Sequence, residues 1–134
     1  MPALVSIEGI GEQYAQKLAL AQIGSTQALL ERGKTRQGRK EIAKIAGVTV
    51  HQILDWVNRA DLFRVDGIGE EYSDLLEASG VDTVVELSKR DPEHLHAKLL
   101  DVNGRRRLVR RPPALKMVED WIAQAKKLPR AVEY

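Results

Sequence analysis

Cationic side chains supply the strongest candidate chemistry in this chain, and they gather in two short segments. Arginine carries a planar fork of donors that fits a phosphate in a two-point contact. A group of cations on one face forms an electrostatic footprint for a polyanion. The candidate phosphate-binding side chains are Arg32, Lys34, Arg36, Arg39 and Lys40 in the first segment, and Arg105, Arg106, Arg107, Arg110 and Arg111 in the second.

The charge of the whole chain hides a strong segregation along the sequence. The formal net charge is +2, but residues 1–60 carry +3, residues 61–101 carry −7 and residues 102–134 carry +6. Basic ends of this kind bind an external polyanion, pair with the acidic middle of the same or a neighbouring chain, or remain solvated surface. The pattern leaves these alternatives open, and the density of arginine in the second segment favours nucleic acid there.

A second candidate lies in two glycine turns that belong to an internal repeat. Residues 7–30 recur at 65–88, and the best-conserved portion is Ile7-Glu8-Gly9-Ile10-Gly11 against Val65-Asp66-Gly67-Ile68-Gly69. Each turn precedes a predicted helix, whose first amides and positive dipole end favour an anion. The turns could equally serve only to join two helices. Nearby acids favour that structural role for Gly67 and Gly69, whereas the two roles are evenly balanced for Gly9 and Gly11.

The elements that position these groups are predicted to be helical almost throughout, because no segment alternates apolar and polar residues. N-cap residues, capping boxes and apolar stripes mark the helix starts and faces. Residues 34–40 form a polar basic stretch, and residues 103–113 are expected to form an irregular basic loop. The predicted helices are 12–22, 26–32, 39–46, 50–63, 70–79, 84–90, 92–100 and 114–128.

The repeat also sets the expected domains, 1–64 and 65–134. Asp55-Trp56-Val57 matches Asp120-Trp121-Ile122, so a long helix with a core tryptophan ends each repeat. The first glycine turn has almost nothing before it, and the last helix, 114–128, is left over. We therefore expect that helix to pack beside Gly9–Gly11, which would close the repeats into one compact pseudo-twofold body. A swapped dimer satisfies the same pattern, so monomer and dimer both remain open.

The two turns resemble the hairpins of helix-hairpin-helix modules, and residues 67–100 resemble the small SAM-like helical domains at recombinase N-termini and the RNA polymerase alpha C-terminus. As a whole, the chain resembles an uncharacterised bacterial family of tandem helix-hairpin-helix proteins. This resemblance implies an all-α fold of two interlocked repeats that contact duplex DNA through its backbone without sequence preference. Glu12-Gln13 and Glu70-Glu71 stand where DNA-binding hairpins usually carry a basic residue.

One further stretch resembles a DNA-binding motif. Residues 41–53 are similar to the helix-turn-helix of lactose-repressor-like regulators, in which the start of the second helix reads bases. That similarity would make Thr49, His51 and Gln52 the reading side chains. The match is short and the second repeat lacks the turn, so we favour a helix-turn-helix shape without a reading function.

Other classes of function find little support in the sequence. Cysteine is absent, and the spacing of His94 and His96 directs them away from each other on a helix, so no metal or cofactor is expected. No nucleophile motif, membrane span or signal peptide is visible, which favours a non-catalytic cytoplasmic protein. The leading hypothesis is an accessory protein that binds nucleic acid, above all duplex DNA. The alternative is a protein-interaction adaptor that binds no nucleic acid.

Overall fold

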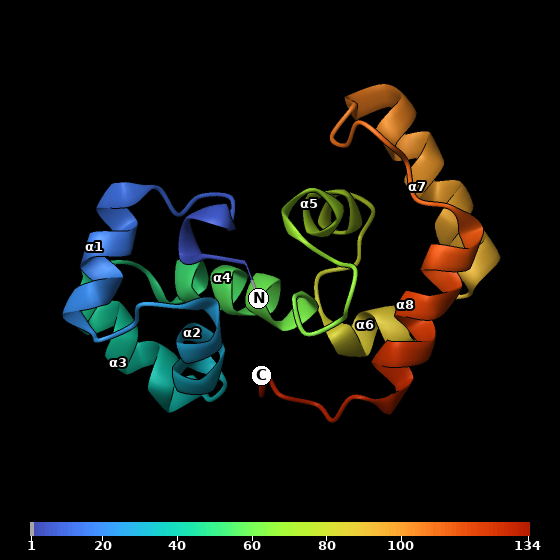
Figure 1. Cartoon of the computed structure of the whole chain (residues 1–134). Coiled ribbons are helices and arrows are strands. Elements are labelled where there is room, and N and C mark those ends of the chain that lie inside the picture. Colours follow the sequence, from blue (N-terminus) through green and yellow to red (C-terminus); the bar gives the residue numbers. More distant parts are fainter. Residues whose placement is uncertain (1) are drawn as a thin grey trace. The chain divides into compact units, whose positions relative to one another are not determined.

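The computed structural model describes residues 2–134, and this part of the chain is helical without any strand (Figure 1). This confirms the predicted all-α class. The elements are a 3-10 helix η1 (Leu4–Ser6) and the α-helices α1 (Glu12–Leu20), α2 (Thr26–Gly33), α3 (Arg36–Ala46), α4 (Val50–Leu62), α5 (Glu70–Ala78), α6 (Val84–Ser88), α7 (Pro92–Arg106) and α8 (Leu115–Lys127).

Local capping explains most of the helix starts. The Ser25 hydroxyl accepts the Ala28 amide at 3.0 Å, and the Asp91 carboxylate accepts the His94 amide at 3.0 Å. At the start of α4, Thr49 and Gln52 form a reciprocal capping box, in which each side chain accepts the other's backbone amide at 3.0 Å. These caps use contacts within four residues, which is why the sequence pattern predicted them.

Two helices are longer than predicted, and both extensions involve the basic segments. α3 begins at Arg36 because Thr35 caps it, its hydroxyl accepting the Gly38 amide at 3.0 Å. α7 continues past the predicted end at Leu100 to Arg106. Residues 36–40 of the first basic stretch and residues 103–106 of the second are therefore helical, which fixes the backbone under several of the arginines.

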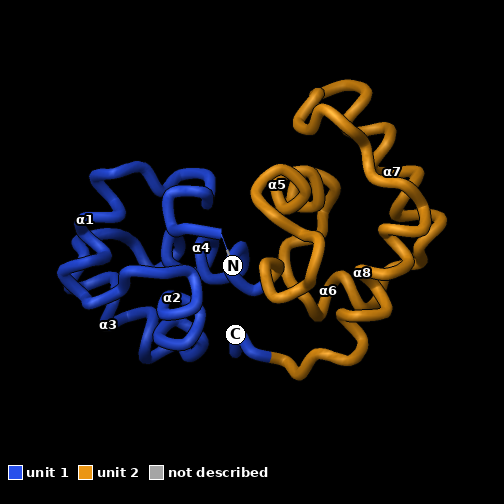
Figure 2. The backbone as a smooth tube through the Cα atoms, viewed as in Figure 1, with its two compact units in different colours: residues 1–61, 131–134 blue, residues 62–130 orange. Residues whose placement is uncertain are grey.

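The chain divides into two units, shown in separate colours in Figure 2. Unit 1 comprises residues 1–61 together with the C-terminal tail, Ala131–Tyr134, and unit 2 comprises Leu62–Arg130. In unit 1, α3 packs against α1 and α2; in unit 2, α8 packs against α6 and α7. The sequence repeats were expected to divide at residues 64–65, whereas the units divide at residues 61–62 and unit 1 also includes the tail.

The same aromatic arrangement fills the glycine turn of each unit. In unit 1, the Tyr14 and Trp56 ring centroids lie 5.3 Å apart with an interplanar angle of 55°. In unit 2, Tyr72 and Trp121 lie 5.1 Å apart, also at 55°. Both tryptophans are buried, as predicted. The internal repeat in the sequence is therefore also a repeat in local packing.

This arrangement corrects the expected role of the last helix. α8 belongs to unit 2, where the Trp121 indole nitrogen lies 3.0 Å from the place that a Cβ on Gly67 would occupy. At Gly9 the equivalent neighbour is Trp56 of α4, at 3.3 Å. The first turn is thus completed by the long helix of its own repeat. The sequence could not show this, because both tryptophan helices carry the same stripe and either could fill the turn.

Candidate nucleic-acid interface

The second basic segment, Arg105–Arg111, which we call the arginine segment, straddles the end of α7. Arg105 and Arg106 lie in the last helical turn, where cations interact favourably with the negative end of the helix dipole. Arg107 ends the helix in a left-handed conformation, with φ of 51°, and its amide donates to the Asn103 carbonyl at 2.8 Å. Helix geometry therefore sets the directions of the first arginines, while Arg110 and Arg111 follow in a bend outside the helix.

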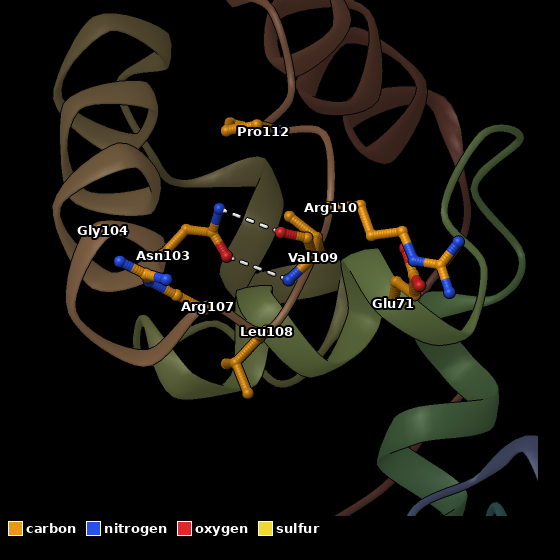
Figure 3. A pocket seen from close by; sticks show the side chains of 8 residues that line it. All are labelled: Glu71, Asn103, Gly104, Arg107, Leu108, Val109, Arg110 and Pro112. Carbon is orange, nitrogen blue, oxygen red and sulfur yellow. Dashed lines mark hydrogen bonds between the residues drawn. The ribbon is translucent and has the colours of Figure 1, made fainter.

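Buried and half-buried partners hold the backbone of the arginine segment. The Asn103 amide group donates to the Val109 carbonyl at 3.2 Å and accepts the Val109 amide at 2.9 Å (Figure 3). The Tyr72 hydroxyl of α5 donates to the Arg111 carbonyl at 3.0 Å. Asn103 is itself buried, so these bonds form away from competing water. The segment is an ordered surface rather than a free loop.

The guanidinium groups of this segment face solvent. All five arginines are exposed, and Arg105 pairs with Asp101 at 2.9 Å on the helix surface. Within residues 2–134, Arg106, Arg107, Arg110 and Arg111 form no ion pair, so the acidic middle of the chain does not neutralise them. Four cations on a fixed backbone retain their full capacity to bind an anion.

A hollow of about 650 Å³ lies beside the arginine segment in unit 2. Figure 3 shows Arg107 on one side of it, with Arg110 and Glu71 on the other. Its lining residues are Glu71, Asn103, Gly104, Arg107, Leu108, Val109, Arg110 and Pro112. Neither the hollow nor the contribution of Asn103 was predicted, because the side-chain pairing of Asn103 with Val109 leaves no periodic signal.

In the first basic segment, Arg32–Lys40, several of the cationic side chains are bonded within unit 1. Arg39 is 3% exposed, and its guanidinium donates to the Gly33 carbonyl at 2.9 Å and to the Glu133 carbonyl at 2.6 Å. Burial lowers the pKa of Arg39 below its usual value, although an arginine remains cationic at neutral pH. Arg39 is therefore a structural side chain, and its predicted role in phosphate binding is corrected.

Two more members of this segment are also engaged within unit 1. Arg32 is exposed and donates to the Ala21 carbonyl at 3.1 Å, which satisfies the end of α1. Lys34 pairs with Glu31 at 2.8 Å, and this hydrogen bond, with the carboxylate charge, raises the Lys34 pKa above 10.5. Among the five, Arg36 and Lys40 are the exposed side chains that form neither a hydrogen bond nor an ion pair within residues 2–134.

The C-terminal tail lies against this segment. The Glu133 amide donates to the Lys34 carbonyl at 2.8 Å, and the Tyr134 hydroxyl donates to Asn58 at 2.9 Å. Beside the tail is a smaller cavity of about 340 Å³, lined by Arg36, Arg39, Lys40, Val50, Leu54 and Tyr134. The tail and the α3 cations therefore share one surface of unit 1.

Each glycine turn leaves the first backbone amides of the following helix without a side-chain cap, and an acidic residue begins that helix. Gly9 and Gly67 have φ of 92° and 97°, a conformation that favours glycine, and their indole neighbours leave little room for a side chain. Gly11 and Gly69 are the N-caps of α1 and α5, and neither helix start receives a side-chain cap. Those amides remain open to an anion, with Glu12 and Glu70 as the first residues of the two helices.

The three side chains that would read bases in a helix-turn-helix, Thr49, His51 and Gln52, form local contacts at the start of α4. Gln52 and Thr49 form the capping box of α4, so their polar atoms satisfy the helix start. His51 is exposed and lies 3.5 Å from Asp55 on the same helix. These contacts give the motif a local structural role, and base reading remains a hypothesis without support from the geometry.

Comparison with known proteins places nearly the whole chain in one family. Residues 8–128 match the model of DUF4332, a domain of unknown function. The chain belongs to the DUF4332 family. No curated protein and no solved structure matches it significantly. The family match includes both glycine turns and the arginine segment, so these features lie inside the DUF4332 domain.

Residues 2–134 contain neither a cluster of metal-ligating side chains nor a membrane-spanning helix. No group of three or more histidine or acidic side chains is placed to hold a metal ion. No helix among these residues has the length and apolar character to cross a membrane. The arginine segment carries four exposed arginines that form no ion pair within residues 2–134.

Proposed function

We propose that this DUF4332 protein binds nucleic acid, with duplex DNA as its main partner, through phosphate contacts made by the arginine segment. The observation that carries the proposal is the set of four exposed arginines, Arg106, Arg107, Arg110 and Arg111, on a backbone fixed by Asn103 and Tyr72. Phosphate contacts position a protein without reading bases, so the binding is sequence-tolerant. The protein acts as an accessory factor and carries out no catalysis.

The two glycine turns support this role as helix-hairpin-helix hairpins. The uncapped amides at the starts of α1 and α5 add two further anion sites to the arginine side chains. Their contribution is smaller, because Glu12 and Glu70 oppose a phosphate at the same helix starts. In unit 1, Arg36 and Lys40 supply the remaining cations.

The test is a titration of a fluorescent random-sequence duplex with the full chain, followed by anisotropy between about 50 and 200 mM salt. The decisive variant carries Arg106→Ala, Arg107→Ala and Arg110→Ala. Removing one arginine–phosphate interaction makes the slope of log affinity against log salt shallower by about 0.9, so the triple variant has a slope shallower by nearly 3. We expect it to bind far more weakly than the parent at every salt concentration.

The matched control removes three lysines from α8 in the same unit, by Lys116→Ala, Lys126→Ala and Lys127→Ala. All three are exposed, so this variant has the same net charge as the arginine variant. It should keep most of the affinity and slope. If both variants lose equal affinity, net charge rather than the arginine segment governs binding. If the unmodified chain binds no duplex at low salt and captures protein partners instead, it is an adaptor.

A further inference from the structure

The hollow beside the arginine segment has the size and fixed walls of a small-ligand site. Its volume of about 650 Å³ lies within the range typical of such sites. Asn103, which lines the hollow, joins α7 to Val109, and Tyr72 joins α5 to Arg111, between the lining residues Arg110 and Pro112. The walls are therefore fixed before any ligand arrives, which reduces the entropy cost of binding.

The lining combines three kinds of chemistry. Arg107 and Arg110 supply positive charge, whereas Glu71 supplies a carboxylate that accepts hydrogen bonds and repels a bare anion. Leu108 and Pro112 add apolar surface. A simple phosphate ion would satisfy the arginines and conflict with Glu71. A ligand that matches all three needs a phosphate, an apolar plane and a hydroxyl or amino donor.

A nucleotide is the component of nucleic acid that carries these three groups together. A continuous duplex keeps its bases stacked inside, where a concave site on a protein cannot reach them. An unpaired or terminal nucleotide presents both its base and its phosphate. The concave hollow thus fits an unpaired or terminal nucleotide, whereas the exposed arginines around it fit the continuous phosphate backbone of a duplex.

We propose that the hollow binds one phosphate-bearing nucleotide, at the end of a strand or free in solution. Arg107 holds the phosphate on one side of the hollow, and Glu71, beside Arg110 on the other side, accepts a hydrogen bond from a sugar hydroxyl or a base amino group. Leu108 and Pro112 supply apolar contacts for the base. The strand-end form of this inference rests on the proposed nucleic-acid binding. It adds to that function a preference for strand ends over uninterrupted duplex.

The test compares three probes with the full-length protein. They are adenosine monophosphate, a short single strand with or without a 5′-phosphate, and a duplex closed by loops so that it has no ends. Amide chemical shifts followed by NMR should move at Gly104, Leu108 and Val109 on addition of adenosine monophosphate. The 5′-phosphate should raise strand affinity by about tenfold, the scale of one charge-assisted hydrogen bond.

Glu71→Ala separates a binding role from simple repulsion, and Glu70→Ala is its matched control. Both acids lie exposed in the first turn of α5, but only Glu71 lines the hollow. Both variants should bind the closed duplex somewhat more tightly, because each removes a negative charge. Only Glu71→Ala should weaken adenosine monophosphate binding and reduce the preference for the phosphorylated strand. Equal behaviour of the two variants with all probes would overturn the assigned role of Glu71.

The probes separate failure of this inference from failure of the proposed function. If the closed duplex binds with a steep salt dependence but neither the mononucleotide nor the 5′-phosphate perturbs the hollow, the inference is overturned and the proposed function stands. If the mononucleotide binds the hollow while no nucleic acid binds, the free nucleotide is the ligand and the proposed function fails. If no probe binds, both are wrong.

Discussion

The two basic segments of this protein lie at different points of the two units and have different structural roles: the first spans the end of α2 and the start of α3, and the second spans the end of α7 and the chain before α8. In unit 1, Arg39 is buried against the Gly33 and Glu133 carbonyls, and Lys34 is paired with Glu31. In unit 2, Arg107 and Arg110 remain exposed beside a hollow. Folding thus engages three cations of the first segment in the structure of unit 1, whereas four arginines of the second segment form no ion pair within residues 2–134. Similar charge in a sequence does not imply similar function.

The largest effect that distinguishes the two segments is on stability. Arg39→Ala removes two charge-assisted hydrogen bonds and leaves two carbonyls without these partners, so unfolding free energy should fall by about 3 kcal/mol. Arg110→Ala removes an exposed side chain and should change it by less than about 0.5 kcal/mol. Urea denaturation followed by circular dichroism measures both values, and Arg36→Ala is the matched exposed control within α3.

In DNA binding, the order of the two effects should be reversed: Arg110→Ala should have the larger effect and Arg39→Ala the smaller. Arg110→Ala weakens binding, whereas folded Arg39→Ala protein retains nearly the affinity of the parent, because a buried guanidinium contacts no phosphate. This comparison is made at a temperature at which both variants are folded. A marked loss of affinity in folded Arg39→Ala protein, without a matching loss in Arg110→Ala, would reverse the roles assigned to the two segments.

Substitutions in the glycine turns should reduce stability by an intermediate amount, and the two units should behave alike. Gly9→Ala and Gly67→Ala each place a side chain at positive φ near an indole, which should cost about 2 kcal/mol of stability. Gly11→Ala and Gly69→Ala meet open space and should cost only about 0.5 kcal/mol, through the weaker N-cap. Thermal and urea unfolding of the four variants measures this. Equal costs at all four positions would contradict the assigned packing of Trp56 and Trp121.

The smallest effect concerns the Lys34–Glu31 pair. Because Glu31 raises the Lys34 pKa above 10.5, the pair contributes stability that is complete below 10.5 and disappears as pH rises through the higher folded-state value. Glu31→Gln should return the Lys34 pKa toward 10.5. NMR titration of the Lys34 side chain, with Lys126 as the internal reference, measures the change. An unchanged Lys34 titration in that variant would show that the pair does not form in solution.

Much of the fold could be predicted from the sequence because its signals are local. Ser25, Thr49, Thr83 and Asp91 cap the helices that their positions indicated. The end of α7 and the start of α3 were misjudged, because clustered charge was taken as a sign of irregular chain. Arginine is in fact a good helix former, and Thr35 provides the cap that begins α3.

The candidate site was predicted in part. The sequence identified the arginine segment, but it gave Arg39 the same role as Arg107. It also gave no sign of Asn103, whose side chain fixes the segment through Val109. An asparagine near a helix end has many possible partners, and only the folded chain selects one. The hollow likewise depends on α5, α7 and the segment between α7 and α8 lying together in unit 2.

The sequence by itself determined the helical class, the repeat and the positions of the helix caps, because these depend on residues within a few positions of one another. Tertiary structure alone decided which cations are available. The Arg39 guanidinium meets a carbonyl 94 residues away in the chain, whereas no acidic side chain of residues 2–134 pairs with Arg107. Burial and pairing depend on what folding brings near a charge, and a local pattern does not contain that information.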